Sequence, residues 1–376
     1  MVLPVVVKKQ KRRLGCARFM FGILIGFVIT IWTIIKSRLE EWDDVTSAPV
    51  ISQLRTFSTK AVTPTFSLLE SKIDPKEPGI LVIYSGPLYV DDETDVDMNE
   101  LFRANFEWFL KNGVDCDIQD TVIVVGKPVF DKYKNQIEDM DRKCMETNHR
   151  IKIVHRHPEC FHMGSMSLIL HGGFIPFDHY KFFIQITNDL SGPFEKTVDE
   201  QPWTLKFTSR MNDNVRLVGL SHVCDGHHSH VQEHAYCLDN TGLELLRQSD
   251  VILNCETFIS ENSRKADNIE RDSIENWHKQ LEMNAASYPI AMSQLILNQA
   301  NYTFTSILQE PLRPINKENR LTCVADDMWT VSHLKSAYNG NLPSWPDLIF
   351  FKTTRYLSDD IAKTIGFKGN ATWIWE

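Results

Sequence analysis

Short apolar runs of strand length alternate with helix-favouring segments in this chain, and the alternation is the strongest constraint on its fold. The runs are rich in β-branched and aromatic residues, which favour strands. They occupy residues 79–85, 121–126, 151–155 and 180–187, and helices are expected between them at 99–110, 131–148 and 162–171. Strands and helices in this order predict an α/β fold, in which a mostly parallel sheet has helices on its faces.

The pattern is less regular after residue 200. Apolar runs at residues 203–207 and 215–220 are interpreted as strands, and residues 240–247 and 273–284 as helices. Residues 289–298 (PIAMSQLILN) are amphipathic, and a first-position proline is typical of a helix that begins there and packs on the core. A last strand is expected at residues 347–352.

Length and composition are those of a globular protein with an unusual amino-terminal charge. The 376 residues suffice for one large domain or two, and 43% of them are hydrophobic, which is enough for a buried core. Residues 1–39 contain eight of the 40 Lys and Arg and no Asp or Glu, so the remainder has 32 basic against 49 acidic residues, a net charge of −17. Such an acidic body does not suit the binding of phosphate backbones, and nucleic acid is therefore not an expected partner.

An uncharged apolar run at residues 19–35 reaches the minimum length of a membrane-spanning helix. Six Lys or Arg precede it and four acidic residues follow at positions 40–44, which predicts a cytoplasmic amino terminus. We therefore expect a single-pass type II protein of the Golgi or endoplasmic reticulum membrane. Its parts would be a cytoplasmic tail (1–18), a transmembrane signal anchor (19–35), a stem (36–78) and a lumenal body (79–376). A cleaved signal peptide is the alternative, although no small-x-small pattern directly follows the run.

Seven of the eight cysteines lie in the body, where an oxidising lumen permits disulfide bonds. An odd number leaves at least one unpaired within a monomer, and short sequence separations favour Cys224 with Cys237, or Cys144 with Cys160. Asn301 and Asn370 each begin an Asn-x-Thr sequon and are candidate glycosylation sites if the body is lumenal.

A carboxylate follows the fourth apolar run. Residues 180–194 read YKFFIQITNDLSGPF, so a strand is succeeded at once by Asn188, Asp189 and a turn containing Gly192 and Pro193. Ligands of open α/β sheets bind beyond the carboxyl ends of the strands, which would place Asp189 within reach of a substrate or of a metal-bridged diphosphate. The alternative is that Asn188 and Asp189 only initiate the turn.

Histidines are concentrated in residues 222–237, which contain five of them. Within this segment, residues 230–234 (HVQEH) match the HxxEH pattern in which two histidines one helical turn apart bind zinc and a glutamate acts as base. A zinc metallopeptidase using His230, Glu233 and His234 is therefore an alternative function. Otherwise these side chains are polar loop residues or contacts to a substrate.

Several of these stretches, taken in order, resemble a eukaryotic glycosyltransferase-like family related to bacterial rhamnan synthesis F proteins. The specific pieces are the NDLSGPF turn and the His-Val-Gln segment at residues 230–232, and looser apolar matches accompany them over residues 80–356. The matching stretches are FFIQITNDLSGPF (182–194), RLVGLS (216–221), HVQ (230–232), TGLELL (241–246), PIAMSQLIL (289–297) and IFFKTTR (349–355).

The resemblance implies a GT-A-like mixed sheet and transfer of a sugar from a nucleotide-sugar donor to a glycan or glycoconjugate acceptor. A leaving diphosphate needs a divalent ion, Mn²⁺ or Mg²⁺, or basic side chains. By this analogy Asn188 and Asp189 form the metal-and-diphosphate motif, with Asp189 as the metal ligand and a catalytic residue. The analogy also assigns phosphate neutralisation to Lys352 and Arg355, and hydrogen bonds to the sugar or diphosphate to His230 and Gln232.

Two positions depart from the family's pattern. Its Phe-Gly-Ala-Trp signature is replaced by residues 162–166 (HMGSM), and the acid that heads its last amphipathic helix is replaced by Pro289, which cannot accept a proton. Glu282 or Asp327, beside Asp326, are candidate replacements for that acid. A non-catalytic lumenal sugar-binding or scaffold protein is therefore a further alternative.

Overall fold

The computed structural model describes residues 79–89, 96–173, 175–194, 201–223, 229–249, 251–266, 271–299, 302–307, 314–319, 349–352 and 359–369. All of them belong to the second of two units into which the chain divides, Ala61–Glu376. The predicted tail, signal anchor and stem lie outside the described residues. Within these residues, no helix combines the length and apolar character that crossing a bilayer requires.

The principal sheet has seven strands in the order β10-β6-β9-β4-β1-β2-β3. Two small antiparallel pairs, β11 with β5 and β7 with β8, lie outside it. The strands are β1 (Gly79–Ser85), β2 (Gln119–Val125), β3 (Ile151–His155), β4 (Tyr180–Thr187), β5 (Leu190–Ser191), β6 (Val215–Gly219), β7 (His222–Val223), β8 (His230–Val231), β9 (Ala235–Asp239), β10 (Thr303–Ser306) and β11 (Phe351–Lys352).

Helices connect these strands. They are α3 (Val96–Asn112), α4 (Lys127–Cys144), α5 (Met163–His171), α6 (Trp203–Thr208), α7 (Asn240–Gln248), α8 (Cys255–Ala266), α9 (Arg271–Asn298) and α11 (Asp359–Ile365), with 3-10 turns at η2 (Met145–Thr147), η3 (Pro158–Cys160) and η4 (Phe177–His179).

The prediction of a mostly parallel sheet flanked by helices is confirmed. Strands β3, β2, β1 and β4 are mutually parallel neighbours, and β10 is parallel to β6. Only β9 runs against its neighbours, with antiparallel pairing to both β4 and β6. The carboxyl end of β4 therefore meets the amino end of β9, which brings residues 187–189 and 234–235 to one edge of the sheet.

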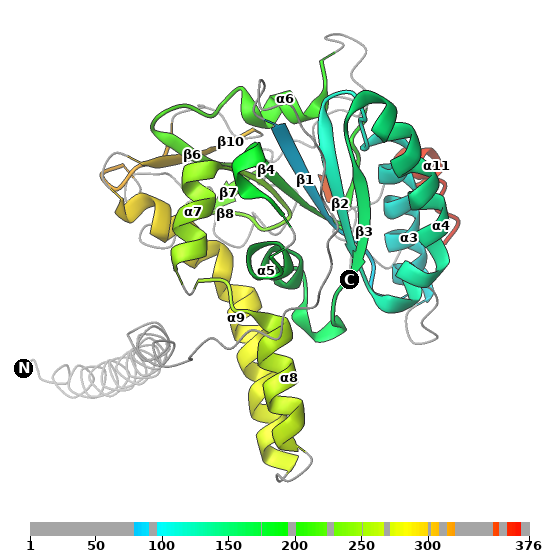
Figure 1. Cartoon of the computed structure of the whole chain (residues 1–376). Coiled ribbons are helices and arrows are strands. Elements are labelled where there is room, and N and C mark those ends of the chain that lie inside the picture. The colour runs from blue at the N-terminus through cyan, green and yellow to red at the C-terminus, as the bar shows by residue number, and fades with distance from the viewer. Residues whose placement is uncertain are drawn as a thin grey trace, which may run out of the picture. The chain divides into compact units, whose positions relative to one another are not determined.

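Both faces of the sheet are covered, because alternate residues of each strand enter different apolar clusters. Leu81 and Ile83 of β1 pack toward α5, α7, α8 and α9, whereas Val82 and Tyr84 pack toward α3, α4 and α6. Figure 1 shows α5 on one side of the sheet and α3 with α4 on the other. Because the side chains on both faces are buried, the strands appear in the sequence as continuous apolar runs.

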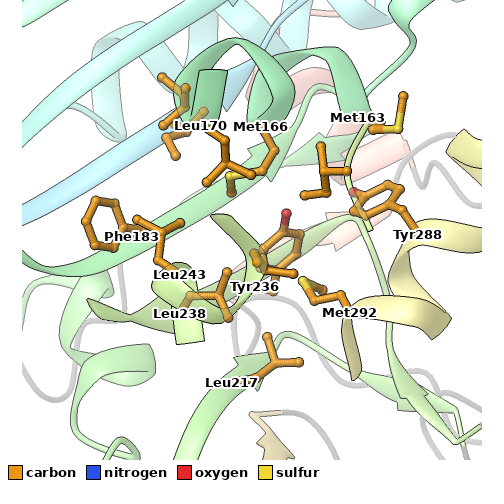
Figure 2. Close-up of a cluster of buried hydrophobic side chains, with 14 of the residues drawn as sticks. Met163, Met166, Leu170, Phe183, Leu217, Tyr236, Leu238, Leu243, Tyr288 and Met292 are labelled. Atoms are coloured by element: carbon orange, nitrogen blue, oxygen red, sulfur yellow. The ribbon is translucent and has the colours of Figure 1, made fainter. Parts of the chain in front are cut away.

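The cluster beneath α5 combines branched aliphatic side chains with methionines and aromatic rings (Figure 2). Met166 of α5 faces Tyr236 of β9, and Met163 lies on the side of Tyr288, which reaches the same cluster with Met292 from α9. All five side chains are at most 1% exposed. Full burial of side chains of this size stabilises the fold by about 1.5–3 kcal/mol each, so α5 and α9 are fixed against the sheet where it carries the candidate site.

Two predictions of secondary structure are wrong. Residues 203–207, interpreted as a strand, belong to helix α6, which starts after Pro202. The aromatic residues that suggested a strand are four positions apart, so Trp203 and Phe207 lie on one helix face, with ring centroids 6.3 Å apart.

The second error concerns Pro289. It was expected to begin a helix, but it lies inside the 28-residue helix α9, which joins the two helices expected at residues 273–284 and 289–298. A proline within a helix removes one backbone hydrogen bond without necessarily ending the helix. Tyr288, next to it, is buried against the sheet, and tertiary packing of this kind can hold a helix together across a proline.

The disulfide pairings favoured by sequence separation are also wrong. Cys144 is bonded to Cys116 and Cys160 to Cys255, over separations of 28 and 95 residues. Cys237 is unbonded and buried in β9, and Cys224 lies outside the described residues. Proximity along the chain failed as a guide because the fold brings the end of α4 to the loop before β2, and η3 to the start of α8.

Candidate ligand site at the carboxyl edge of the sheet

Asp189 is the second residue after the end of β4, at the centre of the sheet's carboxyl edge. The backbone N–H of Asn188 donates to the carbonyl of Ser85 at 3.0 Å, and that of Thr187 donates to the carbonyl of His234 at 2.8 Å. The end of β4 is thus fixed to β1 on one side and to the start of β9 on the other. Asp189 is 7% exposed and Asn188 is 3% exposed.

Helix α3 fixes the turn that follows. The side-chain amide of Asn105 donates to the Asn188 carbonyl at 2.9 Å, and its oxygen accepts from the Ser191 hydroxyl. Trp108, three residues further along the same helix, donates from Nε1 to the Pro193 carbonyl at 3.1 Å. Because Asn105 is fully buried, its two hydrogen bonds hold the NDLS turn rigidly with respect to β4.

The carboxyl-terminal segment reaches the same turn. Strand β11 pairs with β5, so that Lys352 is opposite Leu190, and Phe194 N–H donates to the Ile349 carbonyl at 2.9 Å. Gly192 permits this approach because it has a φ of +134°, and a Cβ there would lie 2.4 Å from the Ile349 carbonyl oxygen. The backbone of Lys352 is therefore beside the residue that follows Asp189.

The carboxylate of Asp189 contacts the side chains of Thr187 and His234. Its Oδ1 accepts a hydrogen bond from the Thr187 hydroxyl, and its Oδ2 lies 2.8 Å from Nδ1 of His234. The other ring nitrogen of His234, Nε2, is 3.7 Å from Oε1 of Glu233. The imidazole of His234 is therefore flanked by two carboxylates, of which Asp189 is buried and Glu233 is about one-third exposed.

Residues 230–234, the HVQEH stretch, do not form the helix that a zinc peptidase requires. His230 belongs to strand β8, and His234 lies in the turn before β9, so the two are not one helical turn apart. Gln232 accepts from the Ser221 hydroxyl and its N–H donates to the Ser221 carbonyl at 3.1 Å. The contact of this stretch with Asp189 is made by His234, two residues after Gln232.

A neighbouring histidine has a structural role. His222 of β7 is 8% exposed and its Nδ1 lies 2.7 Å from the Ser306 hydroxyl. Burial, with a smaller contribution from His230, lowers the pKa of His222 to about 4. This imidazole is consequently neutral at physiological pH and ties β7 to β10.

Buried polar groups with unmet hydrogen-bonding capacity gather around Asp189. Among the described residues, the hydroxyl of Tyr84, Nδ1 of His162 and the hydroxyl of Tyr288 are enclosed without a well-formed hydrogen bond. Burial raises the pKa of Tyr84 and Tyr288 and lowers the pKa of His162. The negative charge of Asp189 raises the pKa of all three groups, so in His162 it opposes the effect of burial. Unsatisfied buried groups are uncommon in folded proteins. Tyr84 and Tyr288 belong to the apolar clusters on opposite faces of the sheet, and what the three groups share is their interaction with the charge of Asp189 at the sheet's edge.

The geometry around Asp189 does not favour a divalent metal ion. Both carboxylate oxygens of Asp189 are engaged by Thr187 and His234. No cluster of three or more His, Cys, Asp or Glu side chains among the described residues is arranged to hold an ion. The described donor set therefore does not fit a Mn²⁺ or Mg²⁺ site in which Asp189 is a ligand, unless one of its partners is displaced.

Other sequence-predicted site residues are not assembled with Asp189 in the described part of the chain. Glu282 is exposed on α9, six residues before the buried Tyr288. Asp327, Arg355, Asn301 and Asn370 lie outside the described residues, as does the side chain of Lys352. Their assignments therefore stay predictions.

Sequence reasoning missed three residues of this site. Asn105 had a detectable signal, because it occupies the apolar face of α3 four residues from both Leu101 and Phe109. A polar residue within a buried stripe commonly holds a specific hydrogen bond. His162 had no comparable signal, and His234 was indicated only as a candidate zinc ligand or substrate contact of the HVQEH pattern. The approach of both to Asp189 depends on the pairing of β4 with β9 and on the position of α5.

Comparisons with known proteins establish no family for the chain. No protein-family profile matches it, and no curated protein matches it in sequence. Solved structures similar to it include a mannosyltransferase, a xylosyltransferase and a 4-diphosphocytidyl-2C-methyl-D-erythritol synthase, all at low identity.

A mannosyltransferase from Pyrobaculum calidifontis, solved with GDP-Man and Mn²⁺, shares 14% identity at a TM-score of 0.27, and the match covers 46% of this chain. The chain spans about half, 48%, of that protein's length. The 4-diphosphocytidyl-2C-methyl-D-erythritol synthase from Anaerococcus prevotii shares 12% identity (TM-score 0.25, covering 46% of this chain and 77% of that one), and apo mouse xyloside xylosyltransferase 1 shares 8% (TM-score 0.22, covering 49% and 75%). At these TM-scores the likenesses assign neither fold family nor function.

Proposed function

We propose that this protein is a GT-A-like glycosyltransferase of the secretory pathway. It would transfer a sugar from a nucleotide-sugar donor to a glycan or glycoconjugate acceptor, with a body held on the lumenal side of a Golgi or endoplasmic reticulum membrane by an amino-terminal anchor. The proposal keeps Asn188, Asp189, His230 and Gln232 as ligand-binding residues.

One observation carries the proposal: the concentration of unsatisfied buried polar groups around Asp189, at the carboxyl edge of a mostly parallel sheet. Ligands of such sheets bind at this edge. The groups present there are carboxylates, imidazoles and phenolic hydroxyls, which together suit the hydroxyl groups of a sugar. The turn that carries Asp189 is fixed by α3, as a binding residue needs to be.

The direct experiment is a calorimetric titration of the purified full-length chain with a panel of nucleotide sugars, with and without Mn²⁺. We expect at least one member to bind, and Asp189→Asn to weaken its affinity by roughly tenfold or more, since a hydrogen bond to a charged group contributes about 1.5–3 kcal/mol. Asp178→Asn is the matched control, because Asp178 is exposed just before the amino end of the same strand.

Transfer itself is tested by release of the nucleoside diphosphate in the presence of candidate acceptors. Binding without release would favour the sugar-binding or scaffold alternative, for which Pro289 at the expected acid position is the motivation. Failure of every nucleotide sugar to bind the wild-type protein would contradict the proposed function.

A further inference from the structure

His162 is the residue immediately before α5. Its carbonyl accepts from the N–H of Ser165 at 3.2 Å and from the side-chain amide of Gln185 at 3.4 Å. Its side chain does not cap the helix. The backbone carbonyl of His162 is thus held by two hydrogen bonds, whereas its imidazole does not cap the helix that follows.

The imidazole is under-used in hydrogen bonding. Nδ1 of His162 is enclosed and has no hydrogen-bond partner among the described residues. Leaving such an atom unpaired is unfavourable for folding. A hydrogen-bond partner for this nitrogen would have to come from something other than the described side chains, such as a bound ligand.

The charges around His162 favour a particular kind of partner. The carboxylates of Asp189 and Glu233 act on the ring, as do Arg156 and His234. Burial, the largest influence, lowers the pKa of His162, so the ring is neutral and has one donor and one acceptor nitrogen. A phosphate oxygen only accepts and would be repelled by the two carboxylates, whereas a hydroxyl group donates and accepts and suits both the ring and the carboxylates.

We propose that His162 contacts a hydroxyl group of the sugar bound beside Asp189, an inference that rests on the proposed function. The sugar belongs either to the donor or to the acceptor, and both offer the same hydroxyl chemistry. His162 is thereby a specificity-determining residue of the site and makes no contact with the diphosphate.

The surroundings hold His162 in place before any ligand binds. Two residues earlier, Cys160 is bonded to Cys255 at the start of α8. The buried guanidinium of Arg156 donates to the carbonyl of Phe161 at 2.9 Å. The backbone N–H of Cys255 donates to the Ser167 hydroxyl oxygen at 3.0 Å, and this hydrogen bond joins α8 to α5. A residue fixed in this way loses little entropy on binding, as expected for a ligand contact.

The test compares His162→Phe and His162→Gln with wild type, using the full-length chain and three ligands. These are a nucleotide sugar that binds, its matching nucleoside diphosphate, and saccharides from a glycan array. His179→Phe is the matched control, because Nδ1 of His179 is also enclosed without a partner among the described residues, but this residue precedes the opposite end of β4.

We expect His162→Phe to weaken nucleotide-sugar binding by roughly tenfold or more, as for the loss of one hydrogen bond in an enclosed site. The affinity for the nucleoside diphosphate should not change, and His162→Gln should lose less because its amide still donates and accepts. His179→Phe should leave all affinities unchanged. Removal of the unsatisfied nitrogen should also leave the Tm of His162→Phe equal to that of wild type or higher, which a histidine with a structural role would not allow.

The remaining outcomes distinguish the source of the hydroxyl and separate this inference from the proposed function. Unchanged donor affinity with a loss of saccharide binding would identify the acceptor as the source. If no nucleotide sugar binds wild type but a saccharide does, and His162→Phe loses it, the transferase proposal fails and the hydroxyl contact stands. Equal weakening of nucleotide sugar and nucleoside diphosphate would overturn the inference, as would unchanged affinity of His162→Phe for every sugar ligand or the absence of any sugar binding by wild type.

Discussion

At the scale of single residues, the site depends on side chains whose hydrogen bonds join elements far apart in the sequence. Asn105 links α3 to the NDLS turn, 83 and 86 residues away. Thr187 and His234 hold the carboxylate of Asp189. These contacts determine where the carboxylate lies, so their loss should affect stability and ligand binding together.

We expect Asn105→Ala to lower the free energy of unfolding by about 1–3 kcal/mol, because the Asn188 carbonyl and the Ser191 hydroxyl would remain buried without this partner. Chemical denaturation of the full-length chain measures the change. Asn112→Ala is a suitable control on the same helix, since Asn112 is only partly buried and donates within α3, to the Trp108 carbonyl. A loss for Asn105→Ala no larger than that of the control would show that the turn does not depend on Asn105.

A second prediction concerns pH. The hydrogen bond that His149 donates to Asp120 raises the pKa of His149 above its usual value, against the opposing effect of burial. Asp120 also accepts from the Tyr180 hydroxyl at 2.6 Å and from the Arg150 N–H at 2.8 Å. A raised pKa in the folded state means that the stabilisation is complete below the unfolded pKa, near 6.5, and is lost as pH rises through the higher folded value.

The unfolding free energy should therefore decrease between pH 6 and pH 8, and His149→Gln should remove that part of the slope. Denaturation of both proteins across this range provides the measurement. Parallel pH profiles for wild type and His149→Gln would contradict the assignment.

At the scale of elements, two disulfide bonds close loops of different length. The Cys160–Cys255 bond closes 95 residues and the Cys116–Cys144 bond closes 28. The entropy of loop closure grows with loop length, so the longer loop should give the larger effect. We expect Cys160→Ala/Cys255→Ala to lower the unfolding free energy by about 2–5 kcal/mol, and by about 1 kcal/mol more than Cys116→Ala/Cys144→Ala.

Non-reducing denaturation of the two double variants checks this order. A larger loss from the Cys116–Cys144 pair would indicate that local packing, and not loop length, determines the contribution of each bond.

Much of the fold was predictable at this scale because both faces of the sheet are buried. The runs at β1, β2, β3, β4 and β6 are therefore apolar in sequence, and the helices α3, α5 and α7 match their expected positions. The errors have a common origin in tertiary packing. Trp203 and Phe207 appear strand-like but pack as a helical pair, and α9 continues through Pro289 because its neighbours are buried.

The candidate site was predictable only in part. Asp189 could be found because a strand that ends in a polar turn is visible in sequence. The pairing of Lys352 with Leu190 was not predicted, because it joins segments about 160 residues apart. The contribution of His162 and His234 could not be found, since it depends on one antiparallel strand, β9, in an otherwise parallel sheet.

At the scale of the whole molecule, the charge asymmetry around residues 19–35 predicts that the body faces the lumen. In sealed microsomal vesicles, added protease should leave residues 79–376 intact and remove only the short amino-terminal tail. Detergent-permeabilised vesicles are the control, in which the body should become accessible. Digestion of the body in intact vesicles would reverse the predicted topology.

The central claim is that a sugar nucleotide binds at the carboxyl edge of the sheet, beside Asp189. The most direct measurement is an experimental structure of the full-length chain with a nucleotide sugar that calorimetry has shown to bind. The account predicts that the sugar lies within hydrogen-bonding distance of Asp189 and His162, between the ends of β4 and β9. A ligand bound at another face, with Asp189 still enclosed by Thr187 and His234 alone, would contradict it.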